Sequence, residues 1–425
     1  MFYQLKNALK DRLRFSWRFL KIFPTKLVLL GARGLYLVLS SRSSIEMESI
    51  YPPDTLCRST THWMAMTGER LGASFIKVDS SCIVPNQLPK TPDGTVRQQL
   101  AMDRNCEWPE TFVVTIPGGR VWSSGHIITP DNQLLDDVTV DFRAVRWTLK
   151  PKTSSVVRYW SFRKLEEYKA RVAVLATDGA DIYFHWIFQL LPRFELIRRA
   201  GIEIGSIDYF FVNDVSKPFQ RDSLESLGIE HSRIIASSKV PHLRARELIV
   251  PSIPIGSGCY WPWMCQFLRA TFLRKGACRR ARAAGRRLYI SRGLASYRRV
   301  LNEVDVIQLL RQHGFEEIRF EQLSMCEQAE SMASCEAVVA PHGAGLSNIV
   351  FCSPGTKVIE IFSPELVTGY FWKLSNQMNL DYYYILGKGL PATLLGNYRQ
   401  SWNARADITV ELSTLSRALE LSNIA

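Results

Sequence analysis

The stretch that decides the fold is Val338-Val-Ala-Pro-His-Gly-Ala-Gly-Leu-Ser-Asn348, which is followed by Val350-Phe-Cys-Ser-Pro-Gly-Thr-Lys-Val-Ile-Glu360. A short apolar run ends at Pro341, a glycine-rich turn follows it, and the next segment is expected to open a helix. A second apolar run, residues 357–362, carries a carboxylate. This order of elements is typical of a nucleotide site, because glycine lets backbone N–H groups approach a phosphate.

The glycine spacing alone is common, since many turns between a strand and a helix carry glycine for steric reasons. His342 inside the turn and Glu360 in the following strand make the prediction more specific. We expect the N–H groups of the turn to point at an anion, and Glu360 to bind ribose hydroxyls.

Working outward, the second half of the chain alternates between short apolar runs and amphipathic stretches. The pattern predicts strands at 288–291, 318–320 and 337–341, and helices at 303–313 and after the capping box Ser324-Met-Cys-Glu327.

The first half is expected to be β-rich over residues 50–150, with a strand at 111–116. Residues 181–200 have apolar residues at helical spacing, and Gly201 ends that pattern. Strands at 209–212 and 248–250 complete an alternation that predicts a parallel sheet covered by helices.

The length of 425 residues exceeds one ordinary core and favours two domains. We predict an α/β fold with two Rossmann-like halves facing a cleft and a β-rich N-terminal portion. Ligands should bind at the carboxyl ends of the strands, in that cleft. The predicted segments are an N-terminal segment 1–50, a first domain 51–255, a linker 256–285 and a second domain 286–425.

The net charge of +13 indicates an anionic partner, and nucleic acid, membrane lipid and nucleotide phosphates all qualify. The nine cysteines form no C-x-x-C pair, so we expect neither a disulfide scaffold nor a zinc site, and a reducing compartment is the simpler interpretation.

Residues 1–26 carry seven basic residues against one acid, with apolar residues between them. The apolar run 27–40 contains Arg33 and is shorter than the roughly 20 residues that span a bilayer. We favour a basic amphipathic segment on an anionic membrane surface. The alternative is a solvated helix packed on its own domain.

Residues 269–299 contain eleven basic residues and no acid. Most of this run is expected to be a solvated linker face. Arg292 differs, because it directly follows the predicted strand 288–291 and can hold a diphosphate bidentately. We see no D-x-D motif after a strand and predict no metal site; arginine and the helix dipole would replace the metal.

A second cluster begins at Asp178-Gly-Ala-Asp181 and continues to Arg193. His185 and Gln189 lie four residues apart, so a helix puts them on one face, which Arg193 continues. His185 is a candidate base, and a hydrogen-bonded core histidine is the alternative.

The chain resembles glycosyltransferase family 61. The motifs that carry the resemblance follow the order of that family and cover roughly residues 110–375: YFHW at 183–186 with LPR at 191–193, LYISR at 288–292, Asn302-Glu303, HGAGLSN at 342–348 and PGTKVIEIF at 354–362.

The resemblance implies a GT-B fold and inverting, metal-independent transfer from a nucleotide-sugar donor to a glycan acceptor, without a cofactor. The second domain would bind the donor and the first the acceptor. The implied donor-binding residues are Arg292, Arg298, His342, Gly343, Ala344, Gly345, Asn348 and Glu360, with Arg299 as a further candidate for the leaving diphosphate. The implied acceptor-side residues are Trp186, Gln189 and Arg193.

One departure from the family concerns the base. The position of Gln189 is usually acidic in the family, and glutamine cannot take a proton. Inverting transfer needs a group that deprotonates the attacking hydroxyl. We therefore assign this role to His185, with Asp181 or Asp178 behind it.

Three rival functions are a catalytically impaired sugar- or nucleotide-binding member of the fold, a basic nucleic-acid-binding protein and a two-domain epimerase. Nucleic acid is not expected, because the arginines lack interleaved stacking aromatics and no nucleic-acid module is present. By family analogy we expect an enzyme of surface or capsular polysaccharide synthesis, in the cytoplasm at the inner face of the cell membrane.

Overall fold

The computed structural model describes residues 53–139, 164–256, 258–273, 285–389 and 405–424. The predicted membrane-surface segment 1–50 and the linker residues 274–284 lie outside these ranges. The segment Pro52–Ala425 forms one compact unit. None of the helices within the described ranges is long and apolar enough to cross a membrane.

The first sheet has ten strands and combines the β-rich N-terminal portion with the alternating part after it. Its main path runs β1-β8-β7-β6-β12-β9-β10-β11, and β5 joins β12 to β2. Strands β9 to β12 pair in parallel, whereas β5 and β6 run antiparallel to β12. The predicted parallel sheet is therefore part of a mixed one. The strands are β1 (Thr55–Cys57), β2 (Ser74–Asp79), β5 (Thr111–Pro117), β6 (Arg120–Trp122), β7 (His126–Ile128), β8 (Gln133–Leu135), β9 (Glu166–Val174), β10 (Tyr209–Val212), β11 (Ile234–Ala236) and β12 (His242–Pro251).

The second sheet has five parallel strands in the order β14-β13-β15-β16-β17. Its apolar runs are buried on both faces, as expected for a parallel sheet covered by helices. The strands are β13 (Arg286–Ile290), β14 (Phe315–Ile318), β15 (Cys335–Pro341), β16 (Lys357–Phe362) and β17 (Asp381–Leu386). A mixed α/β fold is thus confirmed, while the arrangement as two facing GT-B domains stays a prediction.

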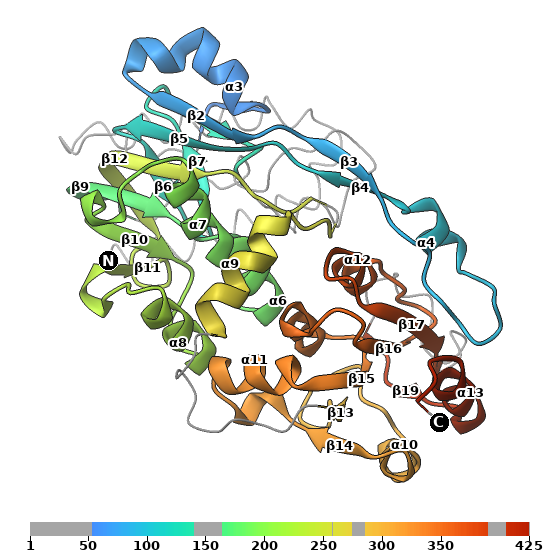
Figure 1. Ribbon diagram of the computed structural model, residues 1–425. Coiled ribbons are helices and arrows are strands. Elements are labelled where there is room, and N and C mark those ends of the chain that lie inside the picture. The colour runs from blue at the N-terminus through green and yellow to red at the C-terminus, as the bar shows by residue number, and fades with distance from the viewer. Residues whose placement is uncertain (1–52, 140–163, 257, 274–284, 390–404, 425) are drawn as a thin grey trace, which may run out of the picture. The chain divides into compact units, whose positions relative to one another are not determined.

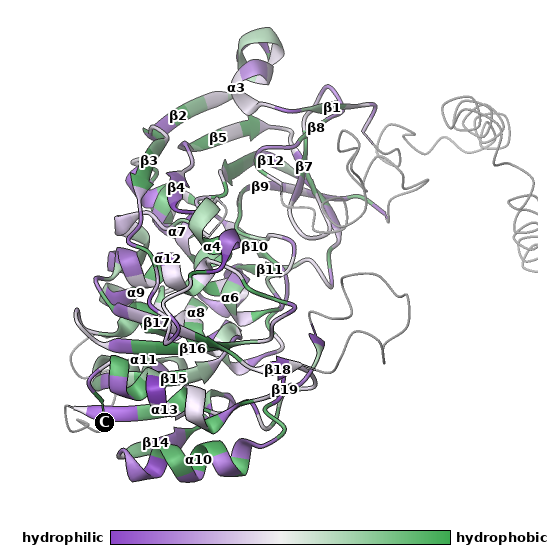
Figure 2. Cartoon of the chain, turned by 90° about the vertical axis from the view of Figure 1, so that its right-hand side faces the viewer, coloured by the Kyte–Doolittle hydropathy of each residue, from purple (hydrophilic) through white to green (hydrophobic). Residues whose placement is uncertain are grey.

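The helices follow the predicted alternation. Ser324 and Glu327 form the predicted capping box of α11, and α10 carries hydrophobic and hydrophilic residues around its turns, as a surface helix does (Figure 2). The helices are α3 (Thr60–Trp63), α4 (Gln98–Met102), α6 (Tyr183–His185), α7 (Leu191–Arg199), α8 (Pro218–Ser226), α9 (Pro262–Phe272), α10 (Glu303–Gln312), α11 (Met325–Ala333), α12 (Tyr370–Gln377) and α13 (Leu412–Leu421). Helix α9 lies inside the predicted linker.

Two helical segments depart from α geometry. A π-helical turn, Trp186–Leu190, separates α6 from α7. After the glycine turn the chain forms a 3-10 helix, Ala344–Phe351, where an α-helix was expected. All residues from 346 to 352 are buried, so this helix packs inside the protein on every side.

One apolar core links the two sheets. It includes Phe188 and Phe210 from the first half, Leu268 from α9, and Val338 and Phe371 from the second half. Figure 1 shows α6 and α9 between the strands of the two sheets, and both helices contact the 3-10 helix after the glycine turn. The segment that holds His185 is therefore packed directly against the turn.

An extension of the first half reaches β17 of the second sheet. It consists of β3 (Cys82–Pro85), α4 and β4 (Asn105–Trp108), drawn in blue and cyan in Figure 1. Lys90 N donates to Tyr382 O at 3.1 Å, and Tyr384 N donates to Lys90 O at 3.0 Å. Asp103 forms an ion pair of 2.6 Å with the fully buried Lys373. These contacts tie the extension to α12 and to β17, the strand that also carries Tyr382.

A disulfide joins Cys106 of β4 to Cys259, and the two Cα atoms are 5.5 Å apart. The expectation that no cysteines pair is wrong for these two. They are 153 residues apart in sequence, so spacing gave no signal, and the fold brings them together. Disulfides are typical of oxidising compartments, which argues against the predicted reducing environment.

We expect peptide mapping of the thiol-blocked, non-reduced protein to recover a linked pair of peptides containing Cys106 and Cys259. The exposed Cys82 provides the internal control, because it has no disulfide partner and should be alkylated before unfolding. Recovery of Cys106 and Cys259 as separately alkylated peptides would contradict the bond and restore the interpretation of a reducing compartment.

Candidate functional site

The glycine turn and Arg292 meet at one edge of the second sheet. Strands β13 and β15 are parallel neighbours, so the residues that follow them emerge side by side. A Cβ atom placed on Gly343 would lie 2.0 Å from Nη1 of Arg292. Only glycine leaves room for the guanidinium at this point. The arginine side chain therefore packs directly against the backbone of the turn.

The backbone of Arg292 is fixed by Glu303 at the start of α10. Oε1 of Glu303 accepts from Tyr289 OH at 2.9 Å, from Ser291 Oγ at 3.0 Å and from Arg292 N at 3.3 Å. The side chain of Arg292 donates through Nε to Arg298 O at 3.2 Å and through Nη2 to Tyr297 O at 3.0 Å. Burial lowers the pKa of Arg292, and the nearby Arg298 adds to this. The site thus holds a partly desolvated positive charge.

The other arginines of the basic run that the structure describes separate into two groups. Arg298 lies beside Arg292 and over the ring of Tyr297, where burial lowers its pKa. Arg299 is exposed and forms an ion pair of 2.7 Å with Asp407, so its charge is already neutralised. Ion pairs also neutralise Arg286, which pairs with Glu316, and Arg287, which pairs with Glu336. Arg269 instead donates hydrogen bonds to the carbonyls of Val350 and Cys352.

A hydrogen-bonded chain of three side chains crosses strands β15, β16 and β17. Glu360 is fully buried, and its carboxylate accepts from His342 Nδ1 and, at 2.5 Å, from Tyr382 OH. A buried carboxylate is stable only when such donors replace water. The prediction that Glu360 binds ribose is therefore corrected, because both oxygens are occupied inside the protein.

The same chain fixes His342. Its Nδ1 is hydrogen-bonded to Glu360, which sets the orientation of the ring and leaves Nε2 on the opposite side. The structure gives Nε2 no hydrogen-bond partner among the described residues. The ring packs against Phe362 and Phe371, with centroids 5.2 and 5.5 Å away. The His342 ring is thereby fixed at the start of the turn whose next residue, Gly343, contacts Arg292.

Asn348 holds the turn instead of facing a ligand. Its Oδ1 accepts from Tyr183 OH at 2.7 Å, and its Nδ2 donates to Gln328 Oε1 at 3.0 Å and to Gly345 O at 3.2 Å. The side chain is fully buried. The predicted donor contact from Asn348 is corrected to a link between α6 and the glycine turn. A Cβ on Gly345 would lie 3.2 Å from Ile290, whereas Ala344 is half-buried at the start of the 3-10 helix.

His185 lies at the end of α6, close to this edge. Its Nδ1 donates to Gln189 Oε1 at 3.1 Å, so Nε2 is the basic nitrogen. Burial lowers the pKa of His185, and the bond to Gln189 acts in the opposite direction with less effect. Phe184 contacts Phe371, the same ring that packs on His342, with centroids 5.9 Å apart. The two histidines therefore flank one pair of phenylalanines.

The two aspartates predicted behind His185 differ in placement. Asp178 is half-buried, and its charge raises the pKa of His185. Asp181 is exposed, and its backbone carbonyl accepts from Lys217. Of the two, Asp178 is the one that acts on the histidine electrostatically.

The predicted acceptor-side face does not form. Trp186 is fully buried and donates through Nε1 to Ser223 Oγ at 2.8 Å, and Gln189 is buried against His185. Arg193 is fully buried and donates to Ala176 O at 2.6 Å and to Pro251 O at 2.6 Å. The π-helical turn explains the error, because its wider spacing rotates Arg193 away from the α-helical face of His185.

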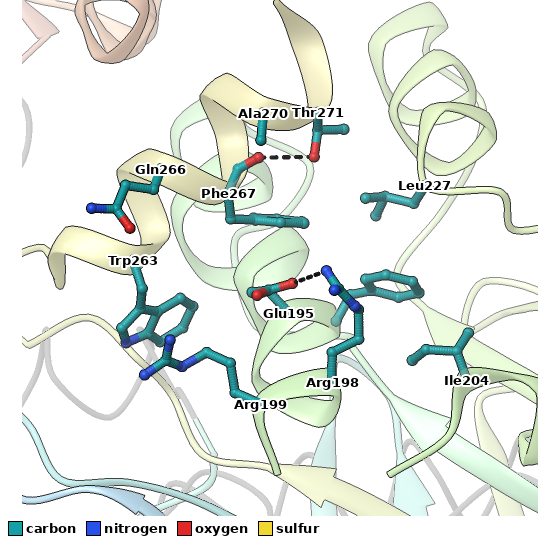
Figure 3. A pocket seen from close by; sticks show the side chains of 11 residues that line it. Glu195, Arg198, Arg199, Ile204, Leu227, Trp263, Gln266, Phe267, Ala270 and Thr271 are labelled. Carbon is teal, nitrogen blue, oxygen red and sulfur yellow. Dashed lines mark hydrogen bonds and ion pairs between the residues drawn. The ribbon is translucent and has the colours of Figure 1, made fainter. Parts of the chain in front are cut away.

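A hollow of about 600 Å³ lies between α7 and α9 (Figure 3). Glu195 and Arg198 form an ion pair of 2.7 Å at its edge, and Arg199 lies over the ring of Trp263. None of the predicted site residues lines it. It is thus a feature of the first half, separate from the candidate site.

The parts of the chain that the structure describes contain no group of three or more His, Cys, Asp or Glu side chains placed to hold a metal ion. The acids around the site have protein partners: Glu303 binds the end of β13, Glu360 binds His342 and Tyr382, and Asp407 binds Arg299.

Sequence reasoning missed four contributors to the site: Tyr297, Glu303, Tyr382 and Arg405. The pair Asn302-Glu303 was visible as a motif, and an acidic residue at the start of the helix that follows β13 was a usable signal. Tyr382 and Arg405 lie far along the chain from their partners, and no local pattern identifies them.

Comparison with known proteins finds similarity over the segment that carries the site. Residues 183–359 match the family model of Glycosyltransferase 61. A stretch of 66 residues is 35% identical to the beta-1,2-xylosyltransferase RCN11 of Oryza sativa subsp. japonica, covering 16% of this chain and 12% of that protein. The family resemblance is confirmed for the segment 183–359, which contains His185, Arg292 and His342.

A structural role for Arg193 predicts a large loss of stability on substitution. We expect Arg193→Leu to lower the free energy of unfolding by about 3 kcal/mol or more, since two buried carbonyls lose their donors at roughly 1–3 kcal/mol each. Arg198→Leu on the same helix is the matched control, because its exposed ion pair contributes at most about 1 kcal/mol. Urea denaturation measures both, and equal stabilities would contradict the assignment.

Proposed function

We propose that this chain, which carries a glycosyltransferase 61 domain over residues 183–359, is a glycosyltransferase that moves a sugar from a nucleotide-sugar donor to a glycan acceptor. The observation that carries the proposal is the contact of the Arg292 guanidinium with Gly343 inside that domain. A partly desolvated guanidinium packed against a glycine turn can stabilise the negative charge of a leaving group. A nucleotide-sugar donor releases such an anion, its nucleoside diphosphate.

The proposed reaction is inverting and needs no metal. The acceptor hydroxyl attacks the anomeric carbon, the bond from that carbon to the diphosphate oxygen breaks, and the diphosphate leaves with the electron pair. Arg292, Arg298 and the N–H groups at the start of the 3-10 helix stabilise the charge that develops on the leaving oxygen. His342 precedes Gly343 in the same turn, with Glu360 and Tyr382 behind its ring.

His185 is the proposed base that takes the hydroxyl proton. Its neutral form does this, and burial favours that form by lowering the pKa of the ring. Gln189 cannot take a proton, but its carbonyl fixes the tautomer in which Nε2 is basic. The glutamine thus orients the histidine, as a carboxylate does in other histidine bases.

The wider role is proposed by analogy with the family: synthesis of surface or capsular polysaccharide, with either a pentose or a hexose as the transferred sugar. A cytoplasmic location with contact to the inner membrane face stays part of the proposal, and the Cys106–Cys259 disulfide argues against it. The rival function is a binding protein of the same fold that lacks turnover.

Transfer assays with a panel of nucleotide sugars and glycan acceptors test the proposal. We expect wild-type turnover, and a loss of about a hundredfold or more in Arg292→Ala, since removal of one preorganised donor to a developing charge costs about 10²–10³ in rate. Arg299→Ala is the matched control and should keep its activity, because Asp407 neutralises that side chain.

Circular dichroism and thermal melting of both variants establish that they are folded. Wild-type turnover by Arg292→Ala would contradict the role of this arginine. Donor binding without turnover in the wild-type chain would favour the rival binding function.

A further inference from the structure

We propose that Tyr297 and Arg405 complete the donor site, with the ring of Tyr297 holding three arginines as one preassembled receptor for a diphosphate. The inference rests on the proposed function, and it adds two residues that no sequence motif marks. The third arginine comes from the segment before β19 (Ile408–Thr409), far along the chain from the strand that delivers Arg292.

The geometry centres on one aromatic ring. The guanidinium carbons of Arg292, Arg298 and Arg405 lie 5.5, 5.0 and 5.5 Å from the centroid of the Tyr297 ring. An aromatic face attracts a guanidinium through its quadrupole at these distances. The ring therefore offsets part of the repulsion among three like charges.

The cluster lacks acidic partners. None of the ion pairs found among the described residues includes Arg292, Arg298 or Arg405. The neighbouring Arg299 shows the contrast, since it pairs with Asp407 at 2.7 Å. The carboxylates of Glu321 and Glu360 act on Arg292 and Arg298 without forming ion pairs with them, so an anion could bind the three guanidiniums directly.

Arg298 has an unusual backbone conformation and a buried side-chain donor without a partner among the described residues. Its backbone has φ 53, in the left-handed region that non-glycine residues rarely adopt. Its Nε is buried and has no hydrogen-bond partner in the described structure. Such strain and an unsatisfied buried donor are typical of a position shaped for a ligand.

The direction of the donors indicates where the ligand lies. Arg292 uses Nε and Nη2 on the carbonyls of residues 298 and 297, which fixes its guanidinium to the loop that carries the ring. Its Nη1 lies against Gly343. The cluster thus borders the turn from which the 3-10 helix starts, and a diphosphate is long enough to touch both the arginines and the turn.

Titration calorimetry on the full chain tests this inference, with inorganic pyrophosphate and with uridine, guanosine, cytidine and adenosine diphosphates as probes. We expect Arg405→Ala to weaken pyrophosphate binding about tenfold, since it removes one charge-assisted contact. Tyr297→Leu should weaken it at least as much, because the ring that gathers the arginines is lost.

Two variants serve as matched controls. Tyr297→Phe retains the aromatic face and loses only the hydroxyl that bonds Arg292 and Arg298, so it should bind more tightly than Tyr297→Leu. Arg299→Ala removes a neighbouring charge that Asp407 already neutralises, and it should bind within twofold of the wild type. Melting temperatures confirm that each variant is folded, and the exposed Arg405 is the variant least able to disturb folding.

The outcomes separate this inference from the proposed function. Wild-type binding by Arg405→Ala, equal losses in Tyr297→Phe and Tyr297→Leu, or no binding of pyrophosphate by the wild type would overturn the three-arginine receptor. If the variants bind nucleoside diphosphates as tightly as the wild type does, the three-arginine receptor is overturned and the proposed function stands. Binding of pyrophosphate that depends on both residues, without binding of any nucleoside diphosphate, would support the receptor and count against a nucleotide-sugar donor.

Discussion

The packing of the Arg292 guanidinium against Gly343 is the contact on which the rest of the site depends. Parallel pairing of β13 with β15 delivers both residues to one edge of the sheet, and Glu303 locks the backbone of the arginine there. A side chain at position 343 would occupy the place of the guanidinium. Position 343 therefore needs glycine because of the arginine. The backbone of Gly343 is extended, at φ 176, and any residue could adopt it.

The acids around this contact decide which cations stay available. Glu360 is used inside the sheet by His342 and Tyr382, and Asp407 is used by Arg299. The arginines around Tyr297 form no ion pairs with carboxylates of the described residues. Burial lowers the pKa of Arg292 and of Arg298, because it disfavours their charged forms. This division gives the edge of the sheet a positive charge. It also explains why Arg286, Arg287 and Arg299, which belong to the basic run, do not contribute to the site.

Much of the fold followed from local sequence. Apolar runs located strands β5, β13 and β15, and Ser324 with Glu327 located the start of α11, because these signals depend on neighbouring residues alone. The site was predicted less well. The helix of His185 was expected, but its π-helical turn was not, and that turn buries Arg193. The roles of Glu360 and of the disulfide depend on partners from distant strands, which periodicity cannot reveal.

The most direct test of the account is pyrophosphate affinity in Gly343→Ala, measured by calorimetry beside the unfolding free energy. The backbone at position 343 accepts alanine, so any loss of stability should come only from the two carbonyl hydrogen bonds of the displaced guanidinium. The new methyl group should displace the Arg292 guanidinium and weaken binding at least tenfold. Unchanged affinity in a folded Gly343→Ala protein would contradict the central claim that the turn and the arginine act as one anion site.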